Sequence, residues 1–288
     1  MSTKAYEIVT ARLIEMLENG TVPWRKGWAS AGAPQNGHSK RRYRGINAFL
    51  LGLSGYADNR WLTFNQVKEL GGFVQAGSKA TPVVFWKWLE IEDKETGKPV
   101  EIPFLKHYYV FNLEQTQNVK LPPLESVGLP CKAERLEAAE EIVRSMPQAP
   151  AIKHDGGERA YYRPSTDSVH MPSLQAFYGT EEYYSTLFHE LGHSTGHESR
   201  LARSGITEIE GFGTASYSKE ELVAEFTASF LCNHIGLEND ALMANHAAYL
   251  DSWLSVLRKD VKMAVVAASQ AQKAADFILG VANESETD

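Results

Sequence analysis

The stretch Thr180–His197, TEEYYSTLFHELGHSTGH, decides how the second half of this chain is interpreted. It contains His189-Glu190-Leu191-Gly192-His193, in which two histidines lie four residues apart. On a helix this spacing places both imidazoles on one face, one turn apart, where they can reach one tetrahedral metal ion. We therefore expect a long helix, capped by Thr180, that offers His189 and His193 to a zinc ion.

Glu190 follows the first histidine and lies about 100° around the helix, beside the metal rather than aimed at it. That position suits a general base, which takes the proton of an activated water and later delivers it to a leaving amine. The alternative is an accidental match that forms a buried structural histidine pair. The position of the motif in mid-helix, after two candidate strands of an α+β domain, favours the metal interpretation.

A catalytic zinc usually takes three protein ligands and a water, so a third ligand must be found. Glu221 and Glu225 would share one face of a helix that we expect Ser218 to cap, and Leu222-Val223-Ala224 between them are apolar. One carboxylate would bind the metal and the other would orient a ligating histidine. We expect Glu220, at the start of the same helix, to be solvated.

Other potential ligands are weaker candidates. His197 competes for the third position, although Thr195-Gly196 should end the first helix before it. The chain has only Cys131 and Cys232 and no CxxC pair, which excludes a thiolate zinc knuckle or a disulfide framework. The metal must use histidine and carboxylate.

The distribution of charge divides the chain of 288 residues, for which two domains with separate cores are the starting expectation. Residues 1–125 hold 16 Lys and Arg against 12 Asp and Glu, whereas residues 126–288 hold 13 against 24. Within residues 22–88 the count is 10 basic to 2 acidic. The first half therefore suits a polyanionic partner.

No run of apolar residues is long enough to span a membrane and no secretory signal is present, so we expect a cytoplasmic protein without a membrane partner.

Hydrophobic periodicity and turn signals predict two α+β domains, at residues 1–120 and 130–288, joined by a Pro-containing segment. In the first domain we expect helices and a hairpin at residues 4–18, 47–53, 63–70, 82–89 and 104–111. In the second we expect further elements at residues 134–146, 159–163, 168–171 and 218–235, and two helices within 241–279.

The first domain interleaves cations with flat side chains. Single-stranded nucleic acid needs this combination, because phosphates require positive charge and unstacked bases require aromatic faces. The alternative is an ordinary solvated basic surface, and strand aromatics such as Trp61, Phe85, Trp86 and Trp88 are at least as well explained as core. The candidate DNA-binding residues are Trp24, Arg25, Lys26, Lys40, Arg41, Arg42, Tyr43 and Arg44.

Several stretches together resemble the ArdC-type antirestriction proteins of conjugative plasmids. PWRKGW, YRGINAFLL, WLTFNQVKELGG and YYVFNLEQT are similar to that family's N-terminal single-stranded-DNA-binding domain. RAYYRP, HELGHSTGH, YSKEELVAEFTASFL and AQKAADFIL are similar to its zincin-like metallopeptidase domain, of the gluzincin type. The resemblance covers nearly the whole chain.

This resemblance implies a role for each matching residue. His189 and His193 would be zinc ligands, Glu190 the catalytic residue, and the third ligand would lie within EELVAE. Gluzincins place the ligand glutamate four positions before an acidic residue that orients a ligating histidine, so the arrangement implies Glu221 as ligand and Glu225 behind it. We expect His197 near the site as well, as a further residue behind the ligands.

The implied function is an antirestriction protein that binds single-stranded DNA and carries a zinc-dependent peptidase site. Its protein substrate is unknown, with a component of the host restriction system as the candidate. One alternative is a non-catalytic DNA-binding shield with a structural zinc site. Another is a DNA-processing metalloenzyme, although nucleases usually hold two metals and only one motif is present here.

Overall fold

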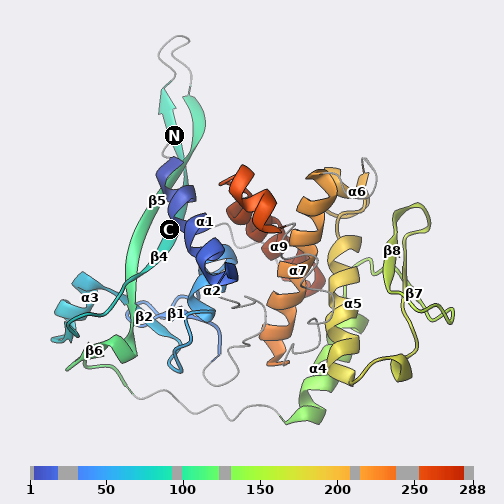
Figure 1. Cartoon of the computed structure of the whole chain (residues 1–288), viewed down its shortest axis with the longest axis horizontal. Coiled ribbons are helices and arrows are strands. Elements are labelled where there is room, and N and C mark those ends of the chain that lie inside the picture. The colour runs from blue at the N-terminus through green and yellow to red at the C-terminus, as the bar shows by residue number, and fades with distance from the viewer. Residues whose placement is uncertain are drawn as a thin grey trace.

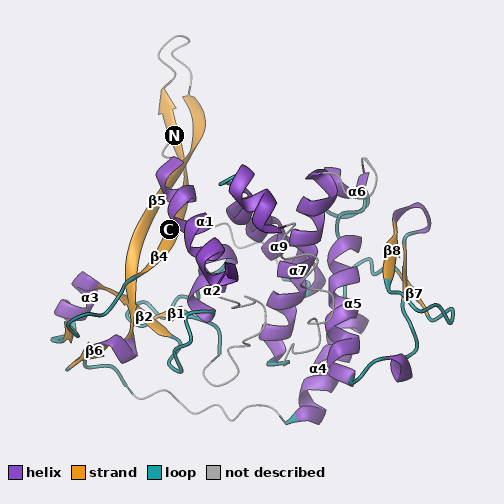
Figure 2. Ribbon diagram, viewed as in Figure 1, coloured by secondary structure: helices purple, strands orange, loops and turns teal. Residues whose placement is uncertain are grey.

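The structure is a computed structural model that describes residues 3–18, 32–92, 99–122, 131–207, 215–237 and 253–281. Its strands gather at two ends of the molecule and its long helices lie between them (Figure 2). A hairpin sheet stands on one side, and a small sheet stands beside α5 on the other (Figure 1). The chain has the expected α+β fold.

The described part of the N-terminal half contains two sheets and three α-helices. The larger sheet has the strand order β1-β2-β5-β4, and β3 pairs with β6. The predicted hairpin is present as the antiparallel pair β4 and β5. Its predicted turn at residues 93–97 lies outside the described residues. The elements are α1 (Thr3–Glu18), β1 (Gln35–Asn36), α2 (Gly45–Gly52), β2 (Arg60–Thr63), α3 (Phe64–Glu69), β3 (Phe73–Val74), β4 (Thr81–Glu92), β5 (Pro99–Asn112) and β6 (Thr116–Gln117).

The start of α3 follows from its sequence. The Thr63 hydroxyl accepts a hydrogen bond from the Gln66 backbone at 3.3 Å, and the Gln66 side chain accepts one from the Thr63 backbone at 2.9 Å. This capping box satisfies two N–H groups that the helix cannot bond internally. The predicted cap at Thr63 is confirmed.

The C-terminal half places a small sheet, of order β7-β9-β8, next to a group of helices. A helical segment covers residues 253–259, and with α9 (Met263–Ile278) it gives the two helices predicted within residues 241–279; residues 241–252 lie outside the described residues. The elements are α4 (Lys132–Ser145), β7 (Ala151–Lys153), β8 (Tyr161–Arg163), β9 (Ser168–His170), α5 (Thr180–Ser194), α6 (Ser204–Thr207), α7 (Ala215–Ile235) and α9 (Met263–Ile278).

Two predicted helix caps are wrong. Gly179 is the N-cap of α5 and Thr180 is already helical. The Glu182 carboxylate reaches back instead and accepts a hydrogen bond from the Tyr178 backbone at 2.8 Å. Helix α7 begins at Ala215, so Ser218 lies in its first turn rather than before it.

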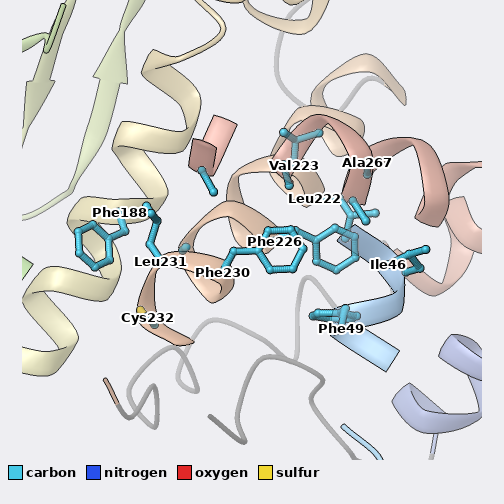
Figure 3. Close-up of a cluster of buried hydrophobic side chains, with 14 of the residues drawn as sticks. Ile46, Phe49, Phe188, Leu222, Val223, Phe226, Phe230, Leu231, Cys232 and Ala267 are labelled. Carbon is cyan, nitrogen blue, oxygen red and sulfur yellow. The ribbon is translucent and has the colours of Figure 1, made fainter. Parts of the chain in front are cut away.

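The expectation of separate cores needs correction. One cluster of buried side chains runs from α1 and α2 through α9 and α7 to α5. At its centre the rings of Phe49 in α2 and Phe226 in α7 meet edge to face, with centroids 4.5 Å apart (Figure 3). A smaller cluster lies under the hairpin sheet. Helix α1 is amphipathic and α2 is apolar over most of its length, and both pack against α9 on one side and β4 on another.

A search of the described helices finds none with the length and apolar character needed to cross a bilayer.

Candidate metal centre

Helices α5 and α7 approach closely at Gly192. A β-carbon at this position would lie 3.2 Å from both the Ala224 α-carbon and the Thr227 β-carbon, which is tighter than an ordinary contact. Only glycine therefore lets the two helices come this close without a shift. This approach brings the histidines of α5 to the carboxylates of α7.

His189, His193 and Glu221 form a metal-binding triad. Their ligand atoms all lie within 4.8 Å of one another, and this is the sole such group found among the described residues. The two Nε2 atoms are 3.1 Å apart, and the Glu221 oxygens lie 3.6 Å from Nε2 of His189 and 3.5 Å from Nε2 of His193. Ligands about 2.1 Å from a tetrahedral zinc would be separated by roughly 3.4 Å. The arrangement therefore fits one ion.

The electrostatics of the triad also fit a cation. Burial alone would lower the pKa of His193, but the carboxylates of Glu221 and Glu220 outweigh it and raise this pKa well above its ordinary value. Burial alone would raise the pKa of Glu221, but the adjacent imidazoles hold it far below its usual range. The site therefore favours positive charge between the imidazoles and the carboxylates, which a divalent cation would supply.

Glu190 is buried beside the triad, with 7% of its surface exposed. Its negative charge contributes to the raised pKa of both His189 and His193, so it lies within electrostatic reach of the ligands. Glu190 is not a member of the ligand group. This is the placement expected of a base that acts beside a metal.

Each ligating histidine has a carboxylate at its back. Glu225 places Oε1 3.4 Å from Nδ1 of His189, as expected for a residue that orients a ligand. Glu220 places Oε1 3.5 Å from Nδ1 of His193. With 5% of its surface exposed, Glu220 is buried rather than solvated, contrary to the sequence-based expectation.

Arg203 explains how Glu220 can be buried as an anion. Its guanidinium forms a two-point ion pair with the Glu220 carboxylate, with Nε 3.0 Å from Oε2. It also donates to the Gly192 carbonyl at 2.8 Å and to the Thr195 hydroxyl at 2.6 Å. Arg203 therefore ties the end of α5 to the carboxylate behind His193. The sequence analysis missed it, because its contacts arise only when the loop after α5 folds back.

His197 lies away from the triad. Helix α5 ends at Ser194 with Thr195 as C-cap, as predicted. The half-buried His197 is not part of the ligand group, and its ring places Nδ1 2.8 Å from the Ser199 hydroxyl, with which it shares a local hydrogen bond.

The candidate DNA-binding residues are only partly described. Trp24, Arg25 and Lys26 lie outside the described residues. Lys40, Arg41 and Arg42 are exposed in the segment between β1 and α2, whereas Tyr43 is half-buried against the cluster under the sheet. Arg44 forms an ion pair with Asp276 of α9. The chain therefore uses Arg44 in the contact between its two halves.

Two known protein families match successive parts of the chain. Residues 3–111 match the family described as the N-terminal domain of anti-restriction factor ArdC. Residues 137–270 match the family described as zincin-like metallopeptidase.

Two solved structures resemble nearly the whole chain. The metal-free crystal structure of antirestriction protein ArdC from the R388 plasmid is 38% identical, with a TM-score of 0.75, over 95% of this chain and 96% of that one. The Mn(II)-bound structure of the same protein is 37% identical, with a TM-score of 0.74, over 97% and 98%.

Curated relatives include a longer class of protein. A DNA primase TraC of Escherichia coli is 40% identical over 95% of this chain, which corresponds to 27% of the primase. A second TraC primase of Escherichia coli is 38% identical, and the match covers 20% of its length. The chain thus spans about a quarter or less of these primases. The uncharacterized protein y4eC of Sinorhizobium fredii is 36% identical over 96% of this chain and 92% of its own length.

Proposed function

This chain belongs to the family of ArdC antirestriction proteins and has a zincin-like metallopeptidase domain, and we propose that it is a zinc-dependent peptidase that binds single-stranded DNA. The observation that carries the peptidase proposal is the triad of His189, His193 and Glu221 with Glu190 buried beside it. Two imidazoles and one carboxylate form a ligand set typical of catalytic zinc. Manganese, found in the related crystal structure, is the competing ion.

The proposed mechanism assigns one task to each group. His189, His193 and Glu221 would hold the zinc ion, which would supply Lewis acidity to polarise a peptide carbonyl and to lower the pKa of a water. Glu190 takes a proton from the water as its oxygen adds to the carbonyl carbon. The same carboxyl then gives that proton to the amide nitrogen, the C–N bond breaks, and a carboxylic acid and an amine are released. Glu225 and Glu220 hold the two imidazoles in orientation throughout.

The number of protein ligands supports catalysis over a structural zinc site. Structural zinc is usually enclosed by four protein ligands, whereas catalytic zinc keeps a position for water or substrate. Within the described part of the chain the group contains only His189, His193 and Glu221. A protein that only covers DNA, with a structural zinc site, would not require a buried carboxylate beside the ligands, as Glu190 is.

The DNA-binding proposal rests on the N-terminal half. Its match to the N-terminal domain of ArdC, its excess of basic residues and its exposed rings support a single-stranded DNA partner. We propose a protein component of a host restriction system as substrate, and the cytoplasm, where such systems act, as the site of action.

The test is metal analysis and proteolysis by the full chain and its variants. We expect bound zinc in the unaltered chain and in Glu190→Gln, with hydrolysis of restriction-system subunits only by the former. Glu221→Ala should nearly abolish zinc retention, whereas Glu225→Ala should weaken zinc binding by about 10- to 100-fold. Loss of zinc from Glu190→Gln would show that this residue is not the base. Zinc binding without proteolysis, with or without single-stranded DNA, would favour the shield.

A further inference from the structure

One face of strand β5 carries large side chains that the core does not use. Successive residues of a strand point to opposite faces. Val110 belongs to the buried cluster under the sheet, together with Val83 and Trp61. Tyr109 and Phe111 therefore point away from that cluster, and Tyr109 is 49% exposed.

The rings on this second face form two neighbouring pairs. His107 and Tyr109 meet edge to face with centroids 5.6 Å apart. Phe111 and Phe64, the first residue of α3, have centroids 6.4 Å apart, and Phe64 is 47% exposed. Large exposed rings that lie next to one another usually mark a binding surface, whereas single ones do not. We call His107, Tyr109, Phe111 and Phe64 the aromatic row.

Cations lie at the α3 end of the aromatic row. The Lys68 ammonium is 4.6 Å from the centroid of the Phe64 ring. The exposed turn that carries Lys40 is held against α3, because the Asn36 amide donates a hydrogen bond to the Gln66 side chain at 3.1 Å. Positively charged side chains therefore lie near the rings at this end of the sheet.

We propose that the aromatic row is the surface on which single-stranded DNA stacks its bases, with Lys68 and Lys40 facing its phosphates. This inference deepens the proposed DNA binding and rests on it. Each base has a flat face that only an unpaired strand can offer to a protein ring, so exposed rings beside cations suit single strands better than duplexes. The cations favour a nucleic acid over an apolar protein segment as the occupant.

The neighbouring residue Tyr108 provides a matched control for Tyr109. Tyr108 is 45% exposed, nearly as much as Tyr109, but it points to the opposite face, where it contacts Phe85. Removal of either ring takes away a half-exposed tyrosine side chain from the same strand. Only removal of the Tyr109 ring should weaken DNA binding.

The experiment measures binding of a fluorescent oligo(dT) by the full chain through anisotropy. Tyr109→Ala and Phe64→Ala should each weaken binding by about 5- to 150-fold, the range expected for loss of one stacked base. Tyr109→Phe, which keeps the ring, should bind more tightly than Tyr109→Ala, and Tyr108→Ala should bind as the unaltered chain does. Thermal denaturation confirms that each variant is folded.

Each outcome decides the question. If the unaltered chain binds oligo(dT) but Tyr109→Ala and Tyr108→Ala are equally affected or equally unaffected, the aromatic row is not the stacking surface while the DNA-binding function stands. If the unaltered chain does not bind oligo(dT), the DNA-binding function and this inference both fail. A duplex that competes as well as oligo(dT) would also overturn stacking on unpaired bases.

Discussion

Arg203→Met should show how the carboxylate behind His193 is held in place. The side chains of Arg203 and Glu220 are 7% and 6% exposed, so solvent screens their interaction little. Removing the guanidinium leaves a buried carboxylate without its cation. Loss of one partner from a buried ion pair costs about 3–5 kcal/mol of folding free energy. We therefore expect the metal-free variant to unfold at a markedly lower denaturant concentration.

Zinc affinity should fall for a separate reason. Burial alone would raise the pKa of Glu220, and its bonds to His193 and Arg203 outweigh burial and hold the pKa low. Without Arg203 this pKa rises, and the Glu220 carboxylate loses the ion pair that holds it 3.5 Å from Nδ1 of His193. Loss of such an orienting partner typically weakens metal binding by about 10- to 100-fold.

A double variant separates the two effects. Arg203→Met combined with Glu220→Gln removes the unpaired charge. The double variant should therefore recover much of the stability that Arg203→Met loses. The neutral amide cannot replace the carboxylate behind His193, so zinc affinity should stay low. Denaturant unfolding and zinc titration against a chromophoric chelator measure the two quantities. Unchanged zinc affinity in Arg203→Met would refute an orienting role for this arginine.

Two further predictions concern the surroundings of the metal centre. Gly192→Ala should destabilise the chain by about 1–3 kcal/mol through overpacking and should weaken zinc binding, because it pushes α5 from α7; unaltered unfolding curves would contradict this. Burial would raise the pKa of Asp167, but hydrogen bonds from the Arg200 guanidinium and a tyrosine outweigh it and lower the pKa. The interaction should therefore stabilise the fold above the unfolded pKa of about 3.9 and lose its effect as pH falls through the lower folded pKa. Asp167→Asn should be less stable than the parent at neutral pH but not at the lowest pH, as measured by denaturation from pH 2 to 7.

The sequence predicts the triad well because helix geometry converts spacing into position. His189 and His193 must share a face when they lie four residues apart on a helix. The end of α5 at Ser194 follows from the residues that come after it. The choice of Glu221 over Glu225 needed the resemblance to gluzincins, since both share one face of α7.

The sequence fails where a role depends on distant contacts. Glu220 has the local pattern of a solvated residue at a helix start, and only Arg203, 17 positions away, changes that environment. The aromatic row also depends on distant contacts, because strand pairing decides which face of the sheet each side chain of β5 occupies. The choice of face for Tyr109 rather than Tyr108 is settled by the pairing of β5 with β2 and β4.

The shared core determines how the two halves must be studied. Ala5, Val9 and Leu13 of α1 are buried in the same cluster as α7 and α9. In addition, the Thr10 hydroxyl donates to the Val261 carbonyl at 2.7 Å. A fragment of residues 1–120 would expose this apolar face to water and lose the ion pair of Arg44 with α9. Weak DNA binding by such a fragment would therefore report its loss of structure as much as its binding surface. The full chain is the appropriate object for every test of DNA binding, because the helices that carry the metal ligands also complete the core of the half that is proposed to bind DNA.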